Sequence, residues 1–185
     1  MAASRPITAN FFNRPTPLVA RELLGVILWV NGRGGVITET EVYRGEEDNA
    51  CHAHFGRTRR NETLYAAPGT LYIYLCYGMH WMLNIVTEKE GFPAAVLVRS
   101  IISYDPHFPK SHFSPLIGPG RVTKYFGIDG SFNKTSIAAP NIDLAKYVLP
   151  DAKDVNVGPR IGIGFAKEPW RSQPWRFVWQ PNLSP

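Results

Sequence analysis

Five short apolar runs in the first hundred residues constrain the fold of this chain more than any other feature. Each has the composition and length of a β-strand, and Gly, Pro or charged residues separate one run from the next. Such a series implies a substantial, mostly antiparallel sheet. The runs are VILWV (26–30), GGVITETEVY (34–43), TLYIYLCY (70–77), WMLNIVT (81–87) and AAVLVRSI (94–101).

Short helices and irregular segments are predicted around this sheet. Thr16-Pro17 before LVARELL and Gly25 after it predict a helix over 17–24, and RVTKYF, closed by Gly127, predicts a second. Residues 104–117 contain three prolines and no periodicity, which indicates an irregular connection. Two further strand candidates are RIGIGFA (160–166) and PWRFVW (174–179).

Length and composition favour one domain. The chain has 185 residues with 44% hydrophobic content, enough for a single core, and it contains no internal repeat, low-complexity tail or linker. We therefore expect an α+β fold. It should be a single compact domain over residues 1–185, with a curved, mostly antiparallel sheet, flanking short helices and a protruding β-hairpin.

Charge and cysteine content limit the binding partners and the cellular compartment expected for the protein. The 20 Lys+Arg against 15 Asp+Glu give a net charge of +5, which favours polyanionic partners without identifying one. Cys51 and Cys76 lack C-x-x-C spacing, so we expect two reduced thiols. The N-terminus has no apolar signal core, and no apolar run approaches the ~18 residues of a membrane span. These features predict a cytoplasmic chain with no zinc site and no membrane partner.

The segment TETEVY carries the first chemical signal. Side chains alternate along a strand, so Glu39, Glu41 and Tyr43 should share one face, while Thr38 and Thr40 face the other way. A carboxylate and an aromatic ring then stand about 7 Å apart along the strand. On spacing alone, Glu39 and Glu41 are equally eligible as a catalytic group.

The segment GTLYIYLCYGMHWMLNI carries the second signal. Parity places Tyr72 and Tyr74 on one face, with Leu71, Ile73 and Leu75 toward the core. The glycine in Tyr77-Gly78-Met79-His80 indicates a hairpin whose tip projects Tyr77. Asn84 joins the face of Tyr74 only if the hairpin loop has an odd number of residues.

Each of these residues also has an ordinary structural interpretation. The tyrosines could be packing residues, Glu41 a solvated strand residue, and Arg99 a side chain reaching solvent at a strand end. The pair His52 and His54 suggests a metal, but no further ligand cluster accompanies it. A basic loop could be merely solvated or could contact phosphates; it consists of Arg57, Arg59 and Arg60. The combination of general base, stacking rings, aromatic hairpin tip and basic residues matches what base flipping from a duplex requires.

The sequence resembles the alkyladenine (3-methyladenine) DNA glycosylase family over most of its length. The motifs that carry the resemblance are ETEVYRGEEDNACH (39–52), RRN (59–61), PGTLYIYLCYGMHWMLNI (68–85), VLVRS (96–100), IGPGRVTKYFGI (117–128) and PRIGIGFA (159–166). The resemblance implies a compact enzyme that removes damaged purines from duplex DNA without a metal or organic cofactor. Family substrates include 3-methyladenine, 7-methylguanine, hypoxanthine and ethenoadenine.

The resemblance also implies roles for individual residues. Glu41 matches the carboxylate that activates water, and Arg99 matches the arginine that helps to hold it. Stacking partners of the flipped base match Tyr43 on one side and His52 and Tyr74 on the other, with Tyr72 supporting the wall. Asn84 matches the amide that discourages normal guanine, and the backbone carbonyl near Ile161 matches a further water ligand. Tyr77, at the hairpin tip with Gly78 and Met79, matches the wedge that fills the vacated stack.

These residues lead to a monofunctional glycosylase as the main hypothesis. No lysine lies within TETEVY, TLYIYLCY or VLVRS to form a Schiff base, so the product should be an intact abasic site. We expect a monomer acting on double-stranded DNA. Two alternatives stay open: a non-catalytic module that binds damaged or single-stranded nucleic acid, and a hydrolase of free nucleosides.

Overall fold

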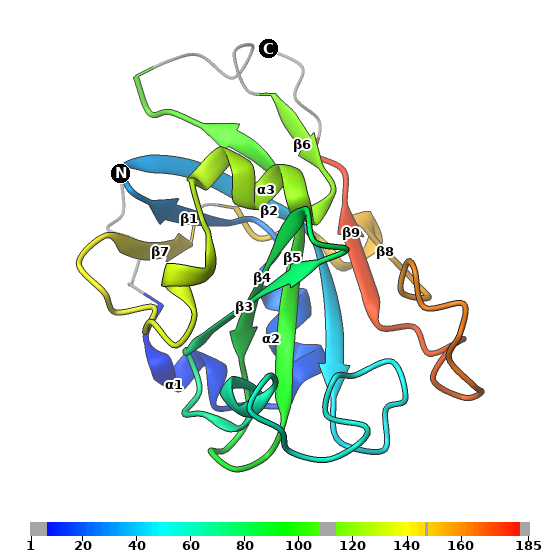
Figure 1. Cartoon of the computed structure of the whole chain (residues 1–185). Helices are drawn as coiled ribbons and strands as arrows, with labels where there is room; N and C mark the ends of the chain where they lie inside the picture. Colours follow the sequence, from blue (N-terminus) through cyan, green and yellow to red (C-terminus); the bar gives the residue numbers. More distant parts are fainter. Residues whose placement is uncertain (1–6, 108–113, 147, 182–185) are drawn as a thin grey trace.

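An antiparallel sheet organises the computed structural model, which describes residues 7–107, 114–146 and 148–181 (Figure 1). Its nine strands in these residues are β1 Val26–Val30, β2 Arg33–Arg44, β3 Leu71–Cys76, β4 His80–Val86, β5 Ala94–Tyr104, β6 Pro115–Ile117, β7 Ile142–Lys146, β8 Val155–Gly158 and β9 Arg176–Trp179. The helices are α1 Ala9–Phe12, α2 Thr16–Glu22 and α3 Pro119–Phe126, with 3-10 turns at Glu62–Tyr65, Gly130–Phe132 and Ala152–Asp154.

The order of the strands makes β2 the centre of the sheet. The main path runs β3-β4-β5-β2-β1-β7, and β6 pairs with β5. On the edge away from β5, β2 changes neighbour along its length: β1 pairs with residues 33–36 and β9 with Glu39–Glu41. The pairing of β2 with β5 shifts register on both sides of Glu39. The chemically distinctive part of β2 therefore lies at an irregularity in the ladder.

The two faces of the sheet have different coverings. On one face Val42, Leu71 and Ile73 enter the main hydrophobic core, and the Thr40 hydroxyl donates to the Ala20 carbonyl of α2 at 2.8 Å. On the other face lie the loop after β2 and the loop before β9, drawn cyan and orange in Figure 1. These loops contact each other, since the Lys167 amide donates to Asn49 Oδ1 at 3.3 Å. The second face therefore lies beneath two loops rather than a helix.

Most sequence predictions of elements are confirmed. The five early runs coincide with β1 to β5 to within a few residues, every strand pair is antiparallel, and PWRFVW contains β9. The first helix starts one residue earlier than predicted, at Thr16, and ends at Glu22. Gly127 closes α3 in the left-handed region at φ 68°, as a terminating glycine should. The fold class is as expected.

Three local predictions were wrong. Segment 104–117 is not wholly irregular, because β5 extends to Tyr104 and Pro115–Ile117 pairs with Ser100–Ile102; residues 108–113 of it lie outside the described residues. Pro115 is tolerated because β6 is a short edge strand. Segment 160–166 is a loop, with Gly162 at φ 79° breaking any strand. Leu75 is 37% exposed, since it lies where the hairpin extends beyond the core.

Two strands, β7 and β8, were not predicted at all. β7 pairs with β1 along its whole length, and β8 pairs with β9. Their sequences, IDLAK and VNVG, mix polar and apolar residues, and Ile142 and Leu144 alone of β7 are buried. Short edge strands of this kind depend on a neighbour for their hydrogen bonds, so local composition does not reveal them.

Candidate functional site

A row of directly opposed residues crosses five strands and forms the floor of the candidate site. Directly opposed residues of antiparallel strands share a face. The hairpin loop between β3 and β4 has three residues, 77–79, so Asn84 pairs with Tyr72 and lies on the face of Tyr74, as the odd-loop condition requires. The row consists of Tyr72, Asn84, Leu97, Glu41 and Arg176.

Glu41 is the buried acid of this floor. Its side chain is 0% exposed, and three donors hold its carboxylate: the Ile161 amide on Oε1 at 2.7 Å, and the Tyr43 hydroxyl at 2.9 Å and Arg99 Nη1 at 3.3 Å on Oε2. Burial raises the pKa of Glu41 above its ordinary value, against the opposing effects of Arg99, the Ile161 amide and Tyr43. A desolvated carboxylate is a stronger base than one in water.

Arg99 reaches Glu41 because of the irregular ladder. Thr40 pairs with Val98 and Glu39 with Ser100, so Arg99 has no opposed residue on β2. Bulges next to active sites commonly redirect a side chain. Here the guanidinium lies between two carboxylates, with Nε 3.3 Å from Glu39 Oε1. The interpretation of Arg99 as a solvated strand-end residue is wrong, because its side chain is 13% exposed and paired on both sides.

Aromatic rings stand above this floor. The rings of His52 and Tyr74 are in edge contact with centroids 4.5 Å apart, and His52 Nδ1 lies 2.8 Å from the Tyr72 hydroxyl. Burial, then the charge of Arg60, lowers the pKa of His52, which keeps the imidazole neutral at pH 7. Burial, then Glu41, raises the pKa of Tyr43 well above its ordinary value, so its hydroxyl stays a donor.

These residues line a cavity with an inner and an outer part. The outer part has a volume of about 470 Å³ and the inner part about 30 Å³, and Tyr43, His52 and Tyr74 line both. The inner space is about the size of one water molecule, whereas the outer cavity is large enough for a ring system. Asn84 lines the inner part, where its Nδ2 donates to the carbonyls of Tyr72 and Met82 at 3.1 and 3.4 Å. Those bonds fix the plane of the amide.

The hairpin tip forms part of the rim. Tyr77 has φ 50° and is 87% exposed, Gly78 has φ 70°, and Met79 is 71% exposed. Tyr77 lines the outer cavity. The prediction that Tyr77 projects from a hairpin tip is confirmed, and the left-handed backbone at two successive positions is what turns the chain there.

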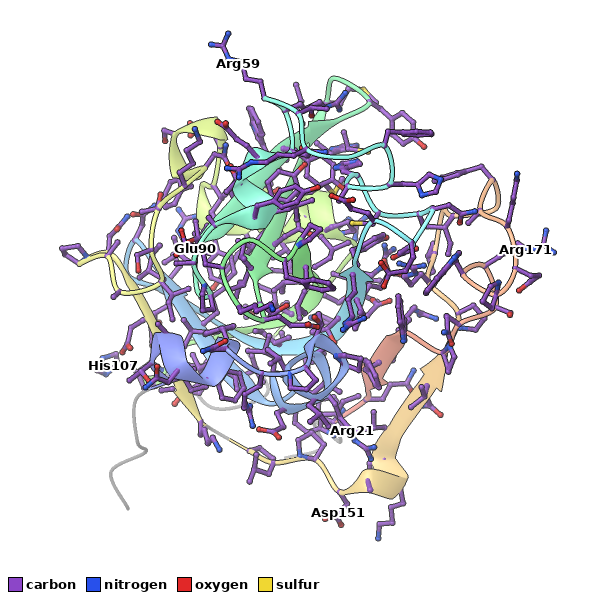
Figure 2. All side chains as sticks on the ribbon, turned by 90° about the horizontal axis from the view of Figure 1, so that it is seen from below. Arg21, Arg59, Glu90, His107, Asp151 and Arg171 are labelled. Carbon is purple, nitrogen blue, oxygen red and sulfur yellow. The ribbon has the colours of Figure 1, made fainter. Side chains whose placement is uncertain are left out.

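The three arginines of the basic loop have three different environments. Arg60 lines the outer cavity, and the Arg57 guanidinium lies over the Tyr65 ring at 5.2 Å. Figure 2 shows Arg59 extending outward from the body of the protein. The structure therefore brings one of the three to the cavity and leaves Arg59 exposed beyond it.

Sequence reasoning missed a buried ion pair behind the site. Asp48 and Arg160 are both 0% exposed, and the guanidinium forms two bonds to the carboxylate at 2.6 and 2.9 Å. Arg160 also lies over the rings of Tyr43 and Trp175 at 4.8 and 5.1 Å. Its neighbour, Ile161, places a backbone N–H rather than a carbonyl against Glu41. The one available signal was that Asp48 and Arg160 lie in two of the motifs that carry the family resemblance, and such motifs say nothing about mutual contact.

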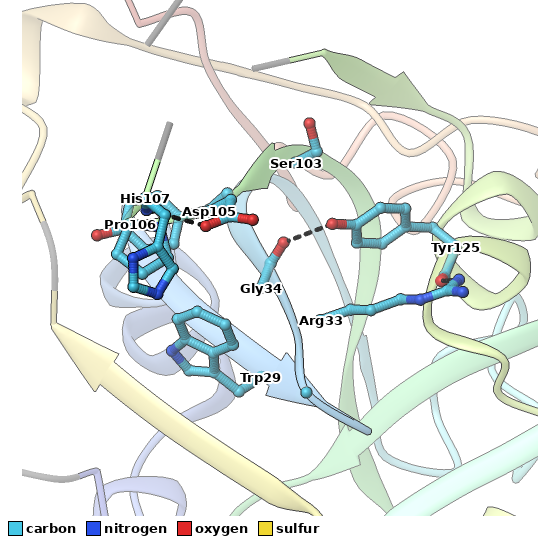
Figure 3. Close-up of a pocket in the computed structure, with 10 residues that line it drawn as sticks. Trp29, Arg33, Gly34, Ser103, Asp105, Pro106, His107 and Tyr125 are labelled. Atoms are coloured by element: carbon cyan, nitrogen blue, oxygen red, sulfur yellow. Dashed lines mark hydrogen bonds between the residues drawn. The ribbon is translucent and has the colours of Figure 1, made fainter. Parts of the chain in front are cut away.

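A second cavity lies at the opposite end of β2 (Figure 3). It has a volume of about 480 Å³, with Trp29, Gly34 and Tyr125 among its lining residues. The Tyr125 hydroxyl donates to the Gly34 carbonyl at 2.9 Å, and Asp105 accepts from the His107 amide at 2.9 Å. None of the predicted site residues lines it. The two cavities are similar in volume but differ in their lining, since the predicted site residues lie around the cavity beside Glu41.

Neither a metal centre nor a membrane-spanning helix is found in the described part of the chain. Within residues 7–107, 114–146 and 148–181, His, Cys, Asp and Glu do not gather in groups of three or more suited to a metal ion. His54 Nδ1 instead lies 2.8 Å from the Glu46 carbonyl. Across the same ranges, no helix has the length and apolar character to cross a bilayer. Cys51 and Cys76 are free thiols, and burial raises the pKa of Cys51 to about 12.

A desolvated acid below a pocket with aromatic walls defines a class of site that receives a flat ring and carries out acid–base chemistry beside it. Residues 10–183 match the family described as methylpurine-DNA glycosylase (MPG), and the chain belongs to this family. The resemblance drawn from the sequence motifs is thus confirmed, and it places the protein among those concerned with damaged DNA.

Bacterial relatives agree with this assignment. The chain is 44% identical over 168 residues to a protein of Wolbachia sp. subsp. Brugia malayi (strain TRS), covering 91% of this chain and 94% of the relative. It is 46% identical over 132 residues to one of Rickettsia felis, covering 71% and 72%, and 38% identical over 184 residues to one of Chlamydia abortus, covering 91% and 94%. All three bear the name "Putative 3-methyladenine DNA glycosylase".

Proposed function

We propose that this protein is a monofunctional DNA glycosylase, a single domain over residues 1–185 that acts as a monomer. It hydrolyses the N-glycosidic bond of 3-methyladenine, 7-methylguanine, hypoxanthine or ethenoadenine flipped out of duplex DNA, and leaves an abasic site. The observation that carries the proposal is the fully buried Glu41 carboxylate, hydrogen-bonded to Tyr43 and Arg99, two residues that line the aromatic cavity.

The chemistry requires one carboxylate. Departure of a purine gives the sugar oxocarbenium character, and an ionised Glu41 both stabilises this charge and takes a proton from the attacking water. An alkylated purine is already a cationic leaving group, so a second carboxyl acid is unnecessary. The neutral bases hypoxanthine and ethenoadenine take up a proton from solvent as they leave. The Glu41 carboxylate has about four acceptor directions, of which three are used, so one is left for water.

The cavity walls supply recognition of the base. Tyr43 stacks on one side of the flipped purine, and His52 with Tyr74 on the other, while Tyr72 holds the His52 ring. Stacking on such rings contributes roughly 1 to 3 kcal/mol per base, comparable with the energy of unpairing. Because the pKa of His52 is lowered, its imidazole adds no positive charge that would repel a cationic base. The Asn84 amide, held in one plane, is the group that obstructs normal guanine.

The rim supplies recognition of the duplex. Tyr77 enters the vacated stack, Gly78 and Met79 contact the flanking nucleotides, and Arg57, Arg59 and Arg60 approach phosphates. A module that only binds nucleic acid has no use for a buried anion beside its rings, and a nucleoside hydrolase has no use for an exposed tyrosine at a hairpin tip. The geometry thus favours the glycosylase over both alternatives.

A gel assay tests the proposal. The protein is incubated, in the presence of a chelator, with labelled duplexes that each contain one of the four lesions, and the products are examined with and without hot alkali. We expect alkali-dependent cleavage at the lesion and none without alkali. Cleavage without alkali would show a lyase, release from the free nucleoside alone would indicate a nucleoside hydrolase, and binding with no abasic site would indicate a binding module.

A further inference from the structure

The two acidic residues of TETEVY share one arginine. Arg99 Nη1 lies 3.3 Å from Glu41 Oε2, and Arg99 Nε lies 3.3 Å from Glu39 Oε1. At these equal distances the guanidinium is shared between the two carboxylates. The charge available to Glu41 therefore depends on how strongly Glu39 attracts Arg99.

Glu39 has partners that Glu41 lacks. Arg176 Nε on β9 donates to Glu39 Oε1 at 2.6 Å, and the Ser100 hydroxyl on β5 donates to Oε2 at 2.5 Å. Burial raises the pKa of Glu39, but the bonds from Ser100 and Arg176 and the charges of the two arginines outweigh it, so the net pKa is lowered. The pKa of Glu41, two residues away, is raised.

Two neighbouring carboxyls whose environments separate their proton affinities normally have different tasks. Glu39 remains an anion and anchors cations, whereas Glu41 is the group poised to exchange a proton. This distinction resolves the choice between the two that spacing alone left open. Neither glutamate lines the cavity. Glu41 is hydrogen-bonded to three residues that do, Tyr43, Arg99 and Ile161, whereas Glu39 reaches the lining only through Arg99.

We propose that Glu39 and Arg176 are positioning residues that set how much of the Arg99 charge reaches Glu41. The proposal rests on the proposed function, since it concerns the carboxylate that acts as general base in that function. Arg176 offsets the negative charge of Glu39, so Arg99 can interact with Glu41 as well as with Glu39. Without Arg176, Glu39 would attract Arg99 more strongly; without Glu39, Arg99 would pair with Glu41 alone.

The other groups around Glu41 are the same in every variant considered. They are Tyr43 on β2, Tyr74 on β3, the Ile161 amide, and Arg160 with its partner Asp48 behind the Tyr43 ring. Across the sheet, Arg176 is the residue opposed to Glu41 on β9. Substitution of Glu39 or Arg176 thus changes only the charges that act on Arg99 and leaves the other neighbours of Glu41 in place.

The test is the pH profile of single-turnover excision from a duplex containing 7-methylguanine. This base carries a fixed positive charge, so the acidic limb reports groups of the protein rather than protonation of the lesion. Relative to the wild-type protein, Glu39→Gln should move the limb to lower pH and Arg176→Gln to higher pH, each by roughly 1 pH unit. The double variant restores the charge balance, and its limb should return close to the wild-type position.

Controls separate positioning from structural damage. Arg176→Lys keeps the charge and should leave the limb near its wild-type position; if Glu39→Gln does not fold, the contrast between Arg176→Gln and Arg176→Lys carries the test. Limbs that stay in place, or that move in the same direction in folded variants, overturn the inference. A wild-type protein that releases no base at any pH instead overturns the proposed function, so the two failures are distinguishable.

Discussion

The interior and the rim of the cavity are built in opposite ways. Inside, Glu41, Asp48 and Arg160 are 0% exposed, and each is held by several hydrogen bonds. At the rim, Tyr77 is 87% and Phe165 73% exposed. The interior has its geometry before any ligand arrives, whereas the rim presents large apolar side chains that gain contacts only when something covers them. Chemistry and binding should therefore respond separately to mutation.

Loss of the interior acid should have the largest effect. Glu41→Gln keeps the shape and removes the base, so single-turnover excision of a lesion should fall by about 10²- to 10⁴-fold, with little change in affinity for lesion DNA. Rapid-quench kinetics and fluorescence anisotropy measure the two quantities. Glu90→Gln, an exposed carboxylate labelled in Figure 2, is the matched control and should keep the wild-type rate. A Glu41→Gln protein with a normal rate would contradict the role of Glu41.

The buried ion pair should dominate stability. Asp48→Asn leaves the Arg160 charge unpaired in the interior, so the free energy of unfolding should decrease by about 3 to 5 kcal/mol. Asp151→Asn is the control, because the exposed Asp151–Lys153 pair, 3.8 Å apart, should contribute about 1 kcal/mol or less. Urea denaturation followed by fluorescence gives both values. Equal losses in the two variants would mean that the interior is not organised by this pair.

Tyr77, the proposed wedge, should affect binding and spare the chemistry. In the Glu41→Gln background, Tyr77→Ser should weaken binding to lesion duplex by about 1 to 3 kcal/mol, the range for loss of one stacked ring. Phe55→Ser removes an aromatic side chain that is 91% exposed but does not line the cavity, and it should leave affinity nearly unchanged. If both variants lose affinity equally, general surface hydrophobicity rather than a wedge explains the effect.

The outermost arginine should have the smallest effect. If Arg59 contacts one phosphate, Arg59→Gln should reduce the slope of log affinity against log salt by about 1. Arg171→Gln, at a different edge of the protein in Figure 2, removes the same charge without that contact. Titration of lesion duplex at several salt concentrations measures both slopes. An equal change in the two slopes would mean that Arg59 contributes only to the net charge of the protein and does not contact a phosphate.

The sequence alone determined those features that depend on short-range periodicity. The alternation in TETEVY placed Glu39, Glu41 and Tyr43 together, and the hairpin signal placed Tyr77 at its tip. The condition set for Asn84, an odd loop length, is met by the three-residue loop of the structure. These predictions succeeded because a strand has a period of two and a three-residue loop preserves parity. Motifs along the chain likewise sufficed to assign the family.

Only the tertiary structure decided how the polar groups of this site are divided. The shift in ladder register put Arg99 between two carboxylates, β9 brought Arg176 to Glu39, and the loop before β9 brought Arg160 to Asp48. These partners lie far from each other in the chain, and no local pattern encodes which distant loop covers a sheet face. Hence spacing along the strand offered two equivalent glutamates, and long-range contacts lowered the pKa of Glu39 while burial raised that of Glu41.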